Sequence, residues 1–144
     1  MPLPKIAVVI LNWNGKHFLE QFLPSVLSST YSNFELIVVD NGSTDDSVEY
    51  IRATYPSVIL VKFERNYGFA GGYNKALKAI SADYYVLLNS DVEVTPSWLE
   101  PMVELLESNN TIAACQPKLL SFNKRLDGRR GVALLSASFI AFYN

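Results

Sequence analysis

Apolar and polar positions along the chain follow two different periods. Four short runs, rich in apolar and β-branched residues, predict strands, and the continuous run at 5–11 predicts a strand that is covered on both faces of a sheet. The segments between them place apolar residues three or four positions apart, which is the spacing of a helix with one buried side. The predicted strands are residues 5–11, 34–40, 58–63 and 83–88, and a fifth short strand is expected within 111–120.

Helices are predicted between the strands, and local residues indicate where they begin. Ser43 resembles an N-cap, with Asp46 three residues later in a near capping-box arrangement. Thr95 and Pro96 would cap and start the last helix, because proline is well tolerated at the first helical position. Pro24 lies inside the first helix and should kink or split it. The predicted helices cover residues 16–29, 43–55, 71–80 and 95–107.

The alternation of strand and helix determines the expected fold class. Neighbouring strands joined by right-handed helical crossovers form an α/β, doubly wound and mostly parallel sheet. The chain has 144 residues, 49% of them hydrophobic, which is enough to bury one core, and no repeat or linker divides it. We therefore expect a single domain whose strands end at a common polar edge.

Polar residues follow directly after each predicted strand. In a doubly wound sheet, ligands bind outside the carboxyl ends of the strands, so these residues are the candidates for a binding site. Turn and cap chemistry explains Asn41, Gly42 and Ser43, but it explains Asp40 and Asp91 less well, because a turn does not need both acids beside buried strands. The candidates are Asn12, Trp13, Asn14, Asp40, Asn41, Asn66, Gly68, Gly71, Gly72, Asn74, Asn89, Ser90, Asp91 and Glu93.

Two common nucleotide-binding signatures are absent from the sequence. No G-x-G-x-x-G follows the first strand, and no G-x-x-x-x-G-K-[ST] occurs anywhere. The glycines lie instead in NYGFAGGYNKAL, residues 66–77, where they would let the backbone approach a ligand at a helix N-terminus that favours negative charge. A tight strand-to-helix connection would use the same glycines, so the segment leaves both interpretations open.

Charge and cysteine content exclude several classes of protein. The net charge of −2 leaves no basic surface of the kind that nucleic acid binds. The single cysteine, Cys115, excludes an internal disulfide and favours a reducing, cytoplasmic location. The only histidine, His17, has no metal-ligand partner at a recognisable spacing. The apolar run near the N-terminus is too short to cross a bilayer.

Three segments, taken together and in order, resemble the family 2 glycosyltransferases of the GT-A (Rossmann-like) fold. The likeness extends from about Lys5 to Lys118 and is nearest to bacterial rhamnosyltransferase-like members. It implies an enzyme that transfers a sugar with inversion, from a UDP- or dTDP-linked donor to a carbohydrate or lipid-linked acceptor, in cell-wall or polysaccharide biosynthesis. The segments are VVILNWNG to VVDNGSTDDS (8–47), NYGFAGGYNKAL (66–77) and YYVLLNSDVEVTPSWLEPMVELLE (84–107).

The resemblance also implies roles for the candidates on the first three loops. Asn12 lies on the loop that lines the base and ribose pocket, where Trp13 could stack on the base. Asp40 corresponds to an acid that hydrogen-bonds the pyrimidine ring or the ribose. The segment 66–74 passes beside the nucleotide. These assignments predict one binding site for a nucleoside diphosphate sugar.

A metal site is implied after the fourth strand. Asn89, Ser90 and Asp91 occupy the place of the family's D-x-D motif, whose last acid binds a divalent metal, Mg²⁺ or Mn²⁺, on the diphosphate. Asn89 replaces the first acid and adds no charge toward the metal. Glu93 is the second candidate, since residues 91 and 93 of an extended segment point the same way. Such an ion would neutralise the charge that develops on the leaving oxygen, and its affinity should depend on the diphosphate.

The resemblance ends near residue 122. Residues 1–122 are interpreted as the nucleotide-sugar-binding portion of a GT-A domain, and residues 123–144 as an atypical tail, truncated or non-native. An inverting transferase needs a carboxylate that takes the proton from the acceptor hydroxyl. The only acid after Glu107 is Asp127, in a segment unlike the family's acceptor region. We therefore expect a C-terminally incomplete fold that binds the donor weakly and transfers sugar slowly or not at all.

Alternatives stay open for the function and for the tail. A non-catalytic nucleotide-binding module of the same fold is the alternative to an enzyme. A receiver-like signalling domain also collects acids at strand ends, but it has no use for the segment 66–74. The apolar residues 132–142 are too short to span a membrane and are expected to cover a sheet edge or to pair with a second copy in a homodimer. Peripheral contact with the inner face of the membrane would come from a lipid acceptor or from partners.

Overall fold

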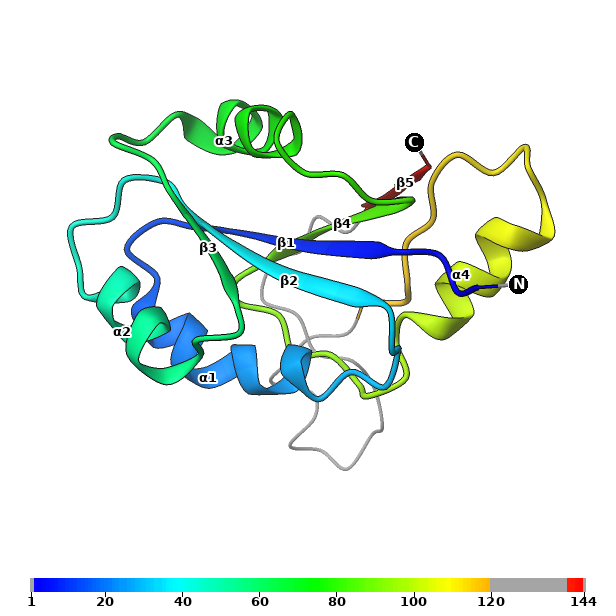
Figure 1. The fold of residues 1–144 in the computed structure, drawn as a ribbon, viewed down its shortest axis with the longest axis horizontal. Coiled ribbons are helices and arrows are strands. Elements are labelled where there is room, and N and C mark those ends of the chain that lie inside the picture. The colour runs from blue at the N-terminus through cyan, green and yellow to red at the C-terminus, as the bar shows by residue number, and fades with distance from the viewer. Residues whose placement is uncertain (1, 120–139, 144) are drawn as a thin grey trace.

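The computed structural model describes residues 2–119 and 140–143, which form one five-stranded sheet with helices on both faces (Figure 1). The strand order is β3-β2-β1-β4-β5. The first four strands in this order are parallel to their neighbours, and β5 runs antiparallel to β4 at the edge. The strands are β1 (Ile6–Asn12), β2 (Phe34–Asp40), β3 (Ile59–Lys62), β4 (Tyr84–Asn89) and β5 (Ile140–Tyr143).

The helices divide between the two faces of the sheet, which confirms the doubly wound α/β fold. Figure 1 shows α1, α2 and α4 on one side of the sheet and α3 on the other. In β1, Ile6, Val8 and Ile10 belong to the core cluster that includes α1 and α4, whereas Ala7 and Val9 belong to the cluster that includes α3. Burial on both faces is why β1 is a nearly continuous apolar run, whereas the edge strand β3 is partly exposed. The helices are α1 (Lys16–Leu27), α2 (Ser47–Thr54), α3 (Gly68–Leu77) and α4 (Glu100–Ser108).

The fifth strand does not lie where the sequence pattern places it. Residues 111–119 form no strand. Ile112, Cys115 and Leu119 instead pack, partly buried, against the cluster that includes α1 and α4. Burial raises the pKa of the Cys115 thiol, as expected for a packed rather than a reactive cysteine. The apolar pattern therefore indicated burial correctly, but burial does not require a partner strand.

The edge of the sheet beside β4 is covered by β5. The pairing runs from Tyr84 opposite Tyr143 to Leu87 opposite Ile140. The expectation that the apolar end of the chain covers a sheet edge is thus confirmed for residues 140–143. Asp127 and residues 132–139 lie outside the described part of the chain.

The starts of three helices differ from the predictions, and α3 begins at Gly68, three residues before its predicted start at residue 71. The helix α2 begins at Ser47, not at Ser43, because the Ser43 hydroxyl accepts hydrogen bonds from the Asn12 side chain and from the Asn14 backbone. The helix α4 begins at Glu100, not at Thr95 or Pro96. The Pro96 carbonyl accepts hydrogen bonds from the backbone and hydroxyl of Thr30, which tie this segment to the loop after α1.

Pro24 does not split α1, which continues as one helix from Lys16 to Leu27. The proline is exposed, so the carbonyl of Glu20, which loses its helical partner, can bond to water. Proline in a helix is therefore tolerated here because it lies on the solvent side.

Asp45 joins the N-termini of α1 and α2. Its Oδ2 accepts from the Lys16 backbone N–H at 3.1 Å, and its Oδ1 accepts from the backbone N–H and the hydroxyl of Ser47. Burial acts to raise the pKa of this carboxyl, but the hydrogen bonds from Ser47 and Lys16 outweigh it and lower the pKa below its usual value. The carboxylate form is therefore favoured more in the folded than in the unfolded chain.

The Asp45 contacts predict a component of acid sensitivity. A carboxyl whose pKa is depressed by folding stabilises the protein above its unfolded pKa of 3.8, and that stabilisation is lost as the pH falls through the lower folded value. Urea unfolding between about pH 6 and about pH 2 should therefore show a shallower loss of stability for Asp45→Asn than for the wild type. Asp46→Asn, on the exposed neighbour, is the control for the change in charge. If the free energy of unfolding falls equally steeply with pH in Asp45→Asn and in the wild type, Asp45 does not contribute to the acid sensitivity.

Candidate functional site

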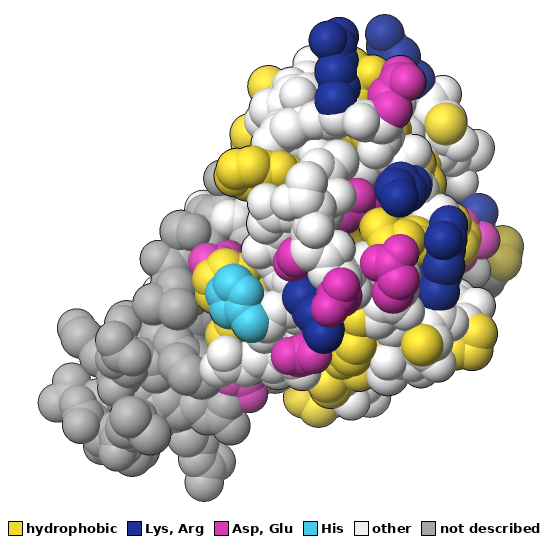
Figure 2. Space-filling model, turned by 90° about the vertical axis from the view of Figure 1, so that its left-hand side faces the viewer, with side chains coloured by type: hydrophobic (Ala, Val, Ile, Leu, Met, Phe, Trp, Pro, Cys, Tyr) yellow, Lys and Arg dark blue, Asp and Glu magenta, His cyan; other side chains and the backbone are white. Residues whose placement is uncertain are grey.

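The polar residues that follow the strands lie at one edge of the sheet. In the ladder between β1 and β2, Asn12 stands opposite Asp40, and in the ladder between β1 and β4, Leu11 stands opposite Asn89. Asp91 follows two residues after the end of β4, so Asp40 and Asp91 lie at the same edge with β1 between their strands. Figure 2 looks onto this edge, where acidic and basic side chains are interspersed. The edge is therefore a single surface on which these groups can act together.

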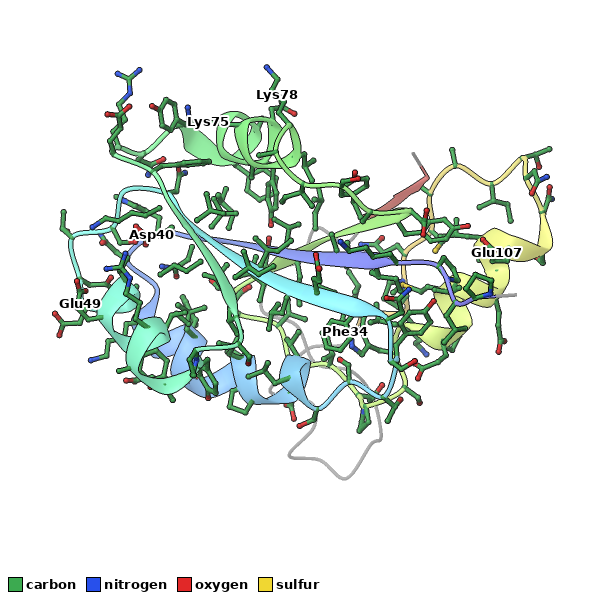
Figure 3. All side chains as sticks on the ribbon, viewed as in Figure 1. Phe34, Asp40, Glu49, Lys75, Lys78 and Glu107 are labelled. Carbon is green, nitrogen blue, oxygen red and sulfur yellow. The ribbon has the colours of Figure 1, made fainter. Side chains whose placement is uncertain are left out.

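Asp40 is an acid buried at the end of β2. The residue is 1% exposed and lies at the end of β2 (Figure 3). Its Oδ1 accepts from the Asn12 side-chain amide at 3.3 Å, and its Oδ2 accepts from the Ser43 backbone N–H at 3.1 Å. Among the described residues it forms no ion pair. A carboxylate can accept about four hydrogen bonds, so Asp40 retains acceptor capacity.

Asn12 is fully buried beside Asp40 and has one unsatisfied atom. Its amide nitrogen donates to Asp40 and to the Ser43 hydroxyl, both at 3.3 Å. Its Oδ1 has no hydrogen-bond partner within the described structure. The amide cannot be reversed without placing two oxygens together, so Asp40 determines its orientation. A Cβ on Gly15 would lie 2.5 Å from this Oδ1, so the glycine provides the space that the amide needs.

The loop after β1 is fastened to the loop after β2. Asn14 has a φ of 49°, a left-handed conformation that asparagine tolerates. Its Oδ1 accepts from the backbone N–H groups of Thr44 and Asp45 at 2.8 and 3.3 Å. Trp13, between Asn12 and Asn14, is 58% exposed. The loop thus holds an aromatic ring at the surface above two anchored asparagines.

The three glycines at the start of α3 have different environments. Gly68 has a φ of 73° and no atom near the position of a Cβ. A Cβ on Gly71 would make only an ordinary contact, 3.5 Å from the Tyr67 Cβ. A Cβ on Gly72 would lie 2.9 Å from Leu11, so this glycine lets α3 pack closely on β1. The Asn66 Oδ1 accepts from the Asn41 side chain and from the Gly68 backbone N–H, and Asn74 is exposed on α3.

A hydrogen bond from α3 holds the end of β4, just before the segment that contains Asp91. Tyr73 is 3% exposed, and its hydroxyl donates to the Leu88 carbonyl at 3.1 Å, one residue before Asn89. Burial raises the pKa of Tyr73 to about 12, and a hydrogen bond from the Leu11 backbone N–H opposes the shift only in part. The hydroxyl therefore stays protonated and remains a donor at neutral pH. Asn89, Ser90, Asp91 and Glu93 are all partly buried.

The site contains residues that the sequence analysis missed. Ser43 was interpreted as a helix cap, but it bonds Asn12 and Asn14. Gly15 and Tyr73 gave no signal, because a glycine after a turn and an aromatic on a helix are ordinary patterns. Their importance depends on which segment lies opposite them in the fold.

The donor set limits how a metal could be held. Among the described residues there is no group of three or more His, Cys, Asp or Glu side chains that could bind a metal by themselves. Asp91 and Glu93 offer two carboxylates at most. Mg²⁺ and Mn²⁺ are commonly bound by one or two carboxylates together with substrate phosphates, so these residues fit a metal that arrives with a diphosphate.

A groove of about 530 Å³ lies on the face of the sheet beside α3, rather than at the polar edge. Its apolar lining includes Ile37, Val61 and Phe63. Its one carboxylate, Glu35, is paired with Lys5 at 3.0 Å. Lys75 and Ser81 add polar groups to this lining, but none of the polar residues that follow the strands lines the groove, so we assign the candidate site to the edge.

The chain has the fold of the GT-A glycosyltransferases. Two solved structures share it: the mannosyltransferase PcManGT from Pyrobaculum calidifontis in complex with GDP-Man and Mn²⁺, with a TM-score of 0.71, and S. aureus TarS 1-349 in complex with UDP-GlcNAc, with a TM-score of 0.67. They are 23% and 21% identical to this chain and match 83% and 81% of it, but 36% and 33% of their own chains. At these identities the likeness establishes the fold.

The chain belongs to glycosyl transferase family 2, whose model matches residues 7–138. An uncharacterized glycosyltransferase of Haemophilus influenzae is 30% identical over 114 residues, which are 77% of this chain and 35% of that protein. The uncharacterized glycosyltransferase alr2836 of Nostoc sp. is 31% identical over 111 residues, which are 75% of this chain and 34% of that protein. The family, the fold and the transferase class predicted from the sequence are thus confirmed, and the chain spans about a third of the length of these relatives.

The structure also bears on membrane crossing. Within residues 2–119 and 140–143, no helix combines the length and the apolar character needed to cross a membrane.

Proposed function

We propose that the edge formed by the loops after β1, β2, β3 and β4 binds a nucleoside diphosphate sugar, as the donor site of an inverting, metal-dependent glycosyltransferase. The burial of Asp40 carries this proposal. A carboxylate that is 1% exposed, with two neutral donors and no positive partner among residues 2–119, is costly unless a ligand adds hydrogen bonds. Two of the fold's solved neighbours hold GDP-Man and UDP-GlcNAc, which supports a nucleotide sugar as that ligand.

Each loop has a role in this proposal. Asp40 accepts a hydrogen bond from a ring N–H of the base or from a ribose hydroxyl. The free Oδ1 of Asn12 accepts a second hydrogen bond, and the exposed ring of Trp13 stacks on the base. The backbone of residues 66–74 passes beside the diphosphate. Asn89 and Ser90 contact the ribose and the phosphates.

Asp91 is the proposed metal ligand, with Glu93 as the second candidate. A divalent ion bound there would neutralise the negative charge that develops on the leaving diphosphate as the glycosidic bond breaks. Asp91 follows a buried strand, so its backbone position is held by the ladder between β1 and β4. The Tyr73 hydroxyl beneath Leu88 stabilises the same strand end.

The remaining parts of the reaction stay predictions. Residues 1–122 are proposed as the donor-binding portion and residues 123–144 as an atypical tail, of which residues 140–143 pair with β4. The general base and the carbohydrate or lipid-linked acceptor are not assigned to described residues, and Asp127 lies outside them. Homodimer formation, a cytoplasmic location and contact with the inner face of the membrane are likewise predictions. Transfer by a longer form of the protein would separate an enzyme from a nucleotide-binding module.

Calorimetry tests the donor site directly. We expect at least one of UDP, dTDP and GDP to bind in the presence of Mn²⁺, and Mn²⁺ alone to bind weakly, because the protein offers two carboxylates at most and the diphosphate supplies the other ligands. The experiment titrates each nucleotide with and without Mn²⁺, and Mn²⁺ without nucleotide. Failure of all three nucleotides to bind would refute the proposed function. Tight binding of Mn²⁺ to the empty protein would refute the dependence on diphosphate.

A further inference from the structure

Asn41, the first residue after β2, is buried and contacts a different loop from its neighbour Asp40. The residue is 2% exposed. Whereas the Asp40 side chain bonds Asn12 and Ser43, the Asn41 side chain bonds the loop between β3 and α3. Consecutive residues at the end of β2 therefore hold two different loops of the candidate site.

The Asn41 amide bonds three consecutive residues of that loop. Its nitrogen donates to the Asn66 Oδ1 at 2.9 Å and to the Gly68 carbonyl at 3.1 Å, and its Oδ1 accepts from the Tyr67 backbone N–H at 3.0 Å. The Asn66 Oδ1 also accepts from the Gly68 N–H at 2.7 Å. Both amide hydrogens of Asn41 are thus used inside the protein, which leaves none for a ligand.

The start of α3 depends on these contacts. Tyr67, which precedes α3, makes no side-chain capping bond of its own. Helix starts leave backbone N–H groups that need partners, and the Asn41 and Asn66 side chains supply them here for Tyr67 and Gly68. A Cβ on Gly72 would lie 3.2 Å from the Asn41 nitrogen, so α3 also packs directly against this amide.

We propose that Asn41 is a positioning residue, which holds residues 66–72 in the conformation that binds the nucleotide and makes no contact with the ligand itself. The identity of the ligand rests on the proposed function. The geometric part of the inference, that Asn41 holds residues 66–72 in one conformation, does not. A loop that is ordered before binding costs less entropy when the ligand arrives, so loss of the Asn41 amide should weaken binding without removing a ligand contact.

Hydrogen exchange tests the geometric part without any ligand. In Asn41→Ala, the backbone amides of Tyr67 and Gly68 should exchange at least about tenfold faster than in the wild type, since each loses a hydrogen bond or its support. Asn33→Ala is the matched control, because its side-chain nitrogen also donates to a backbone carbonyl, that of Leu3 at 2.7 Å, but at the opposite end of β2. Unchanged exchange at Tyr67 and Gly68 in a folded Asn41→Ala protein would overturn the inference.

Nucleotide binding tests the functional part. With Mn²⁺ and the nucleotide that the wild type binds best, Asn41→Ala should raise Kd about tenfold, and Asn33→Ala should leave it unchanged. A double-mutant cycle with Asn66→Ala separates positioning from contact. If Asn41 acts through Asn66, the effects of the two substitutions on Kd are not additive. Additive effects, or an unchanged Kd in Asn41→Ala, would overturn the inference.

The outcomes distinguish this inference from the proposed function. If the wild type binds no nucleotide, the proposed function fails, and faster exchange at Tyr67 and Gly68 still decides the geometric part. If Asn41→Ala does not fold, Asn66→Ala carries the test, because Asn66 is exposed and bridges Asn41 to Gly68. In that case, faster exchange at Gly68 together with a higher Kd supports the inference, and no change in either overturns it.

Discussion

Replacement of Asp91 by alanine should abolish the Mn²⁺-dependent part of nucleotide binding. In the proposed site, Asp91 and the diphosphate hold the ion together, so its removal should raise the nucleotide Kd by about 100-fold with Mn²⁺ and very little in the presence of a chelator. Calorimetry or equilibrium dialysis of wild type and Asp91→Ala, each with Mn²⁺ and with chelator, measures both values.

Two controls make the Asp91 result specific. Asp83→Asn removes the same charge just before the other end of β4, where Asp83 accepts from the Lys5 backbone N–H at 2.7 Å, and it should leave the Kd unchanged. Glu93→Gln should raise the nucleotide Kd with Mn²⁺ only if Glu93 also binds the metal. If Asp91→Ala keeps the full difference between Mn²⁺ and chelator, the metal lies elsewhere and the assignment is wrong.

Replacement of Gly42 by alanine should cause the largest loss of stability among the glycine substitutions at this edge. Gly42 has a φ of 75°, and a Cβ there would lie 2.5 Å from the Arg65 carbonyl carbon and 2.8 Å from the Asn66 nitrogen. These are backbone atoms, which cannot rotate away as a side chain could. The left-handed conformation and the displacement of the loop should together cost about 2–5 kcal/mol. Urea unfolding of both proteins measures the loss.

Gly71→Ala is the matched comparison, and it also tests whether the nucleotide passes close to the backbone of α3. Its Cβ would meet only the Tyr67 Cβ at 3.5 Å, within α3, where alanine stabilises a helix relative to glycine by about 0.5–1 kcal/mol. If the nucleotide passes close to this backbone, the same variant should bind it more weakly while being more stable. A strongly destabilised Gly71→Ala, or a Gly42→Ala protein as stable as the wild type, would contradict this account of the two glycines.

Much of the fold could be predicted from local pattern. Continuous apolar runs such as residues 6–11 must be buried on both faces, so they become inner strands of a parallel sheet. Parallel strands end at the same edge, and the placement of Asp40 and Asp91 there follows from the order of runs and loops alone. The motifs in these loops also sufficed to identify the family. Local pattern was weakest where burial did not need a strand, as at residues 111–119.

The amino-acid sequence by itself determined which residues reach the polar edge, because strand burial and chain order are local properties of the hydrophobic pattern. Only the tertiary structure decided the partners of these residues. Ser43 bonds Asn12 across 31 positions, and Asn41 bonds Asn66 across 25, so neither partner is readable from neighbours in the chain. A short polar side chain can form hydrogen bonds within its own turn or with an opposite loop equally well. The register of the strands determines which of these partners lies within reach.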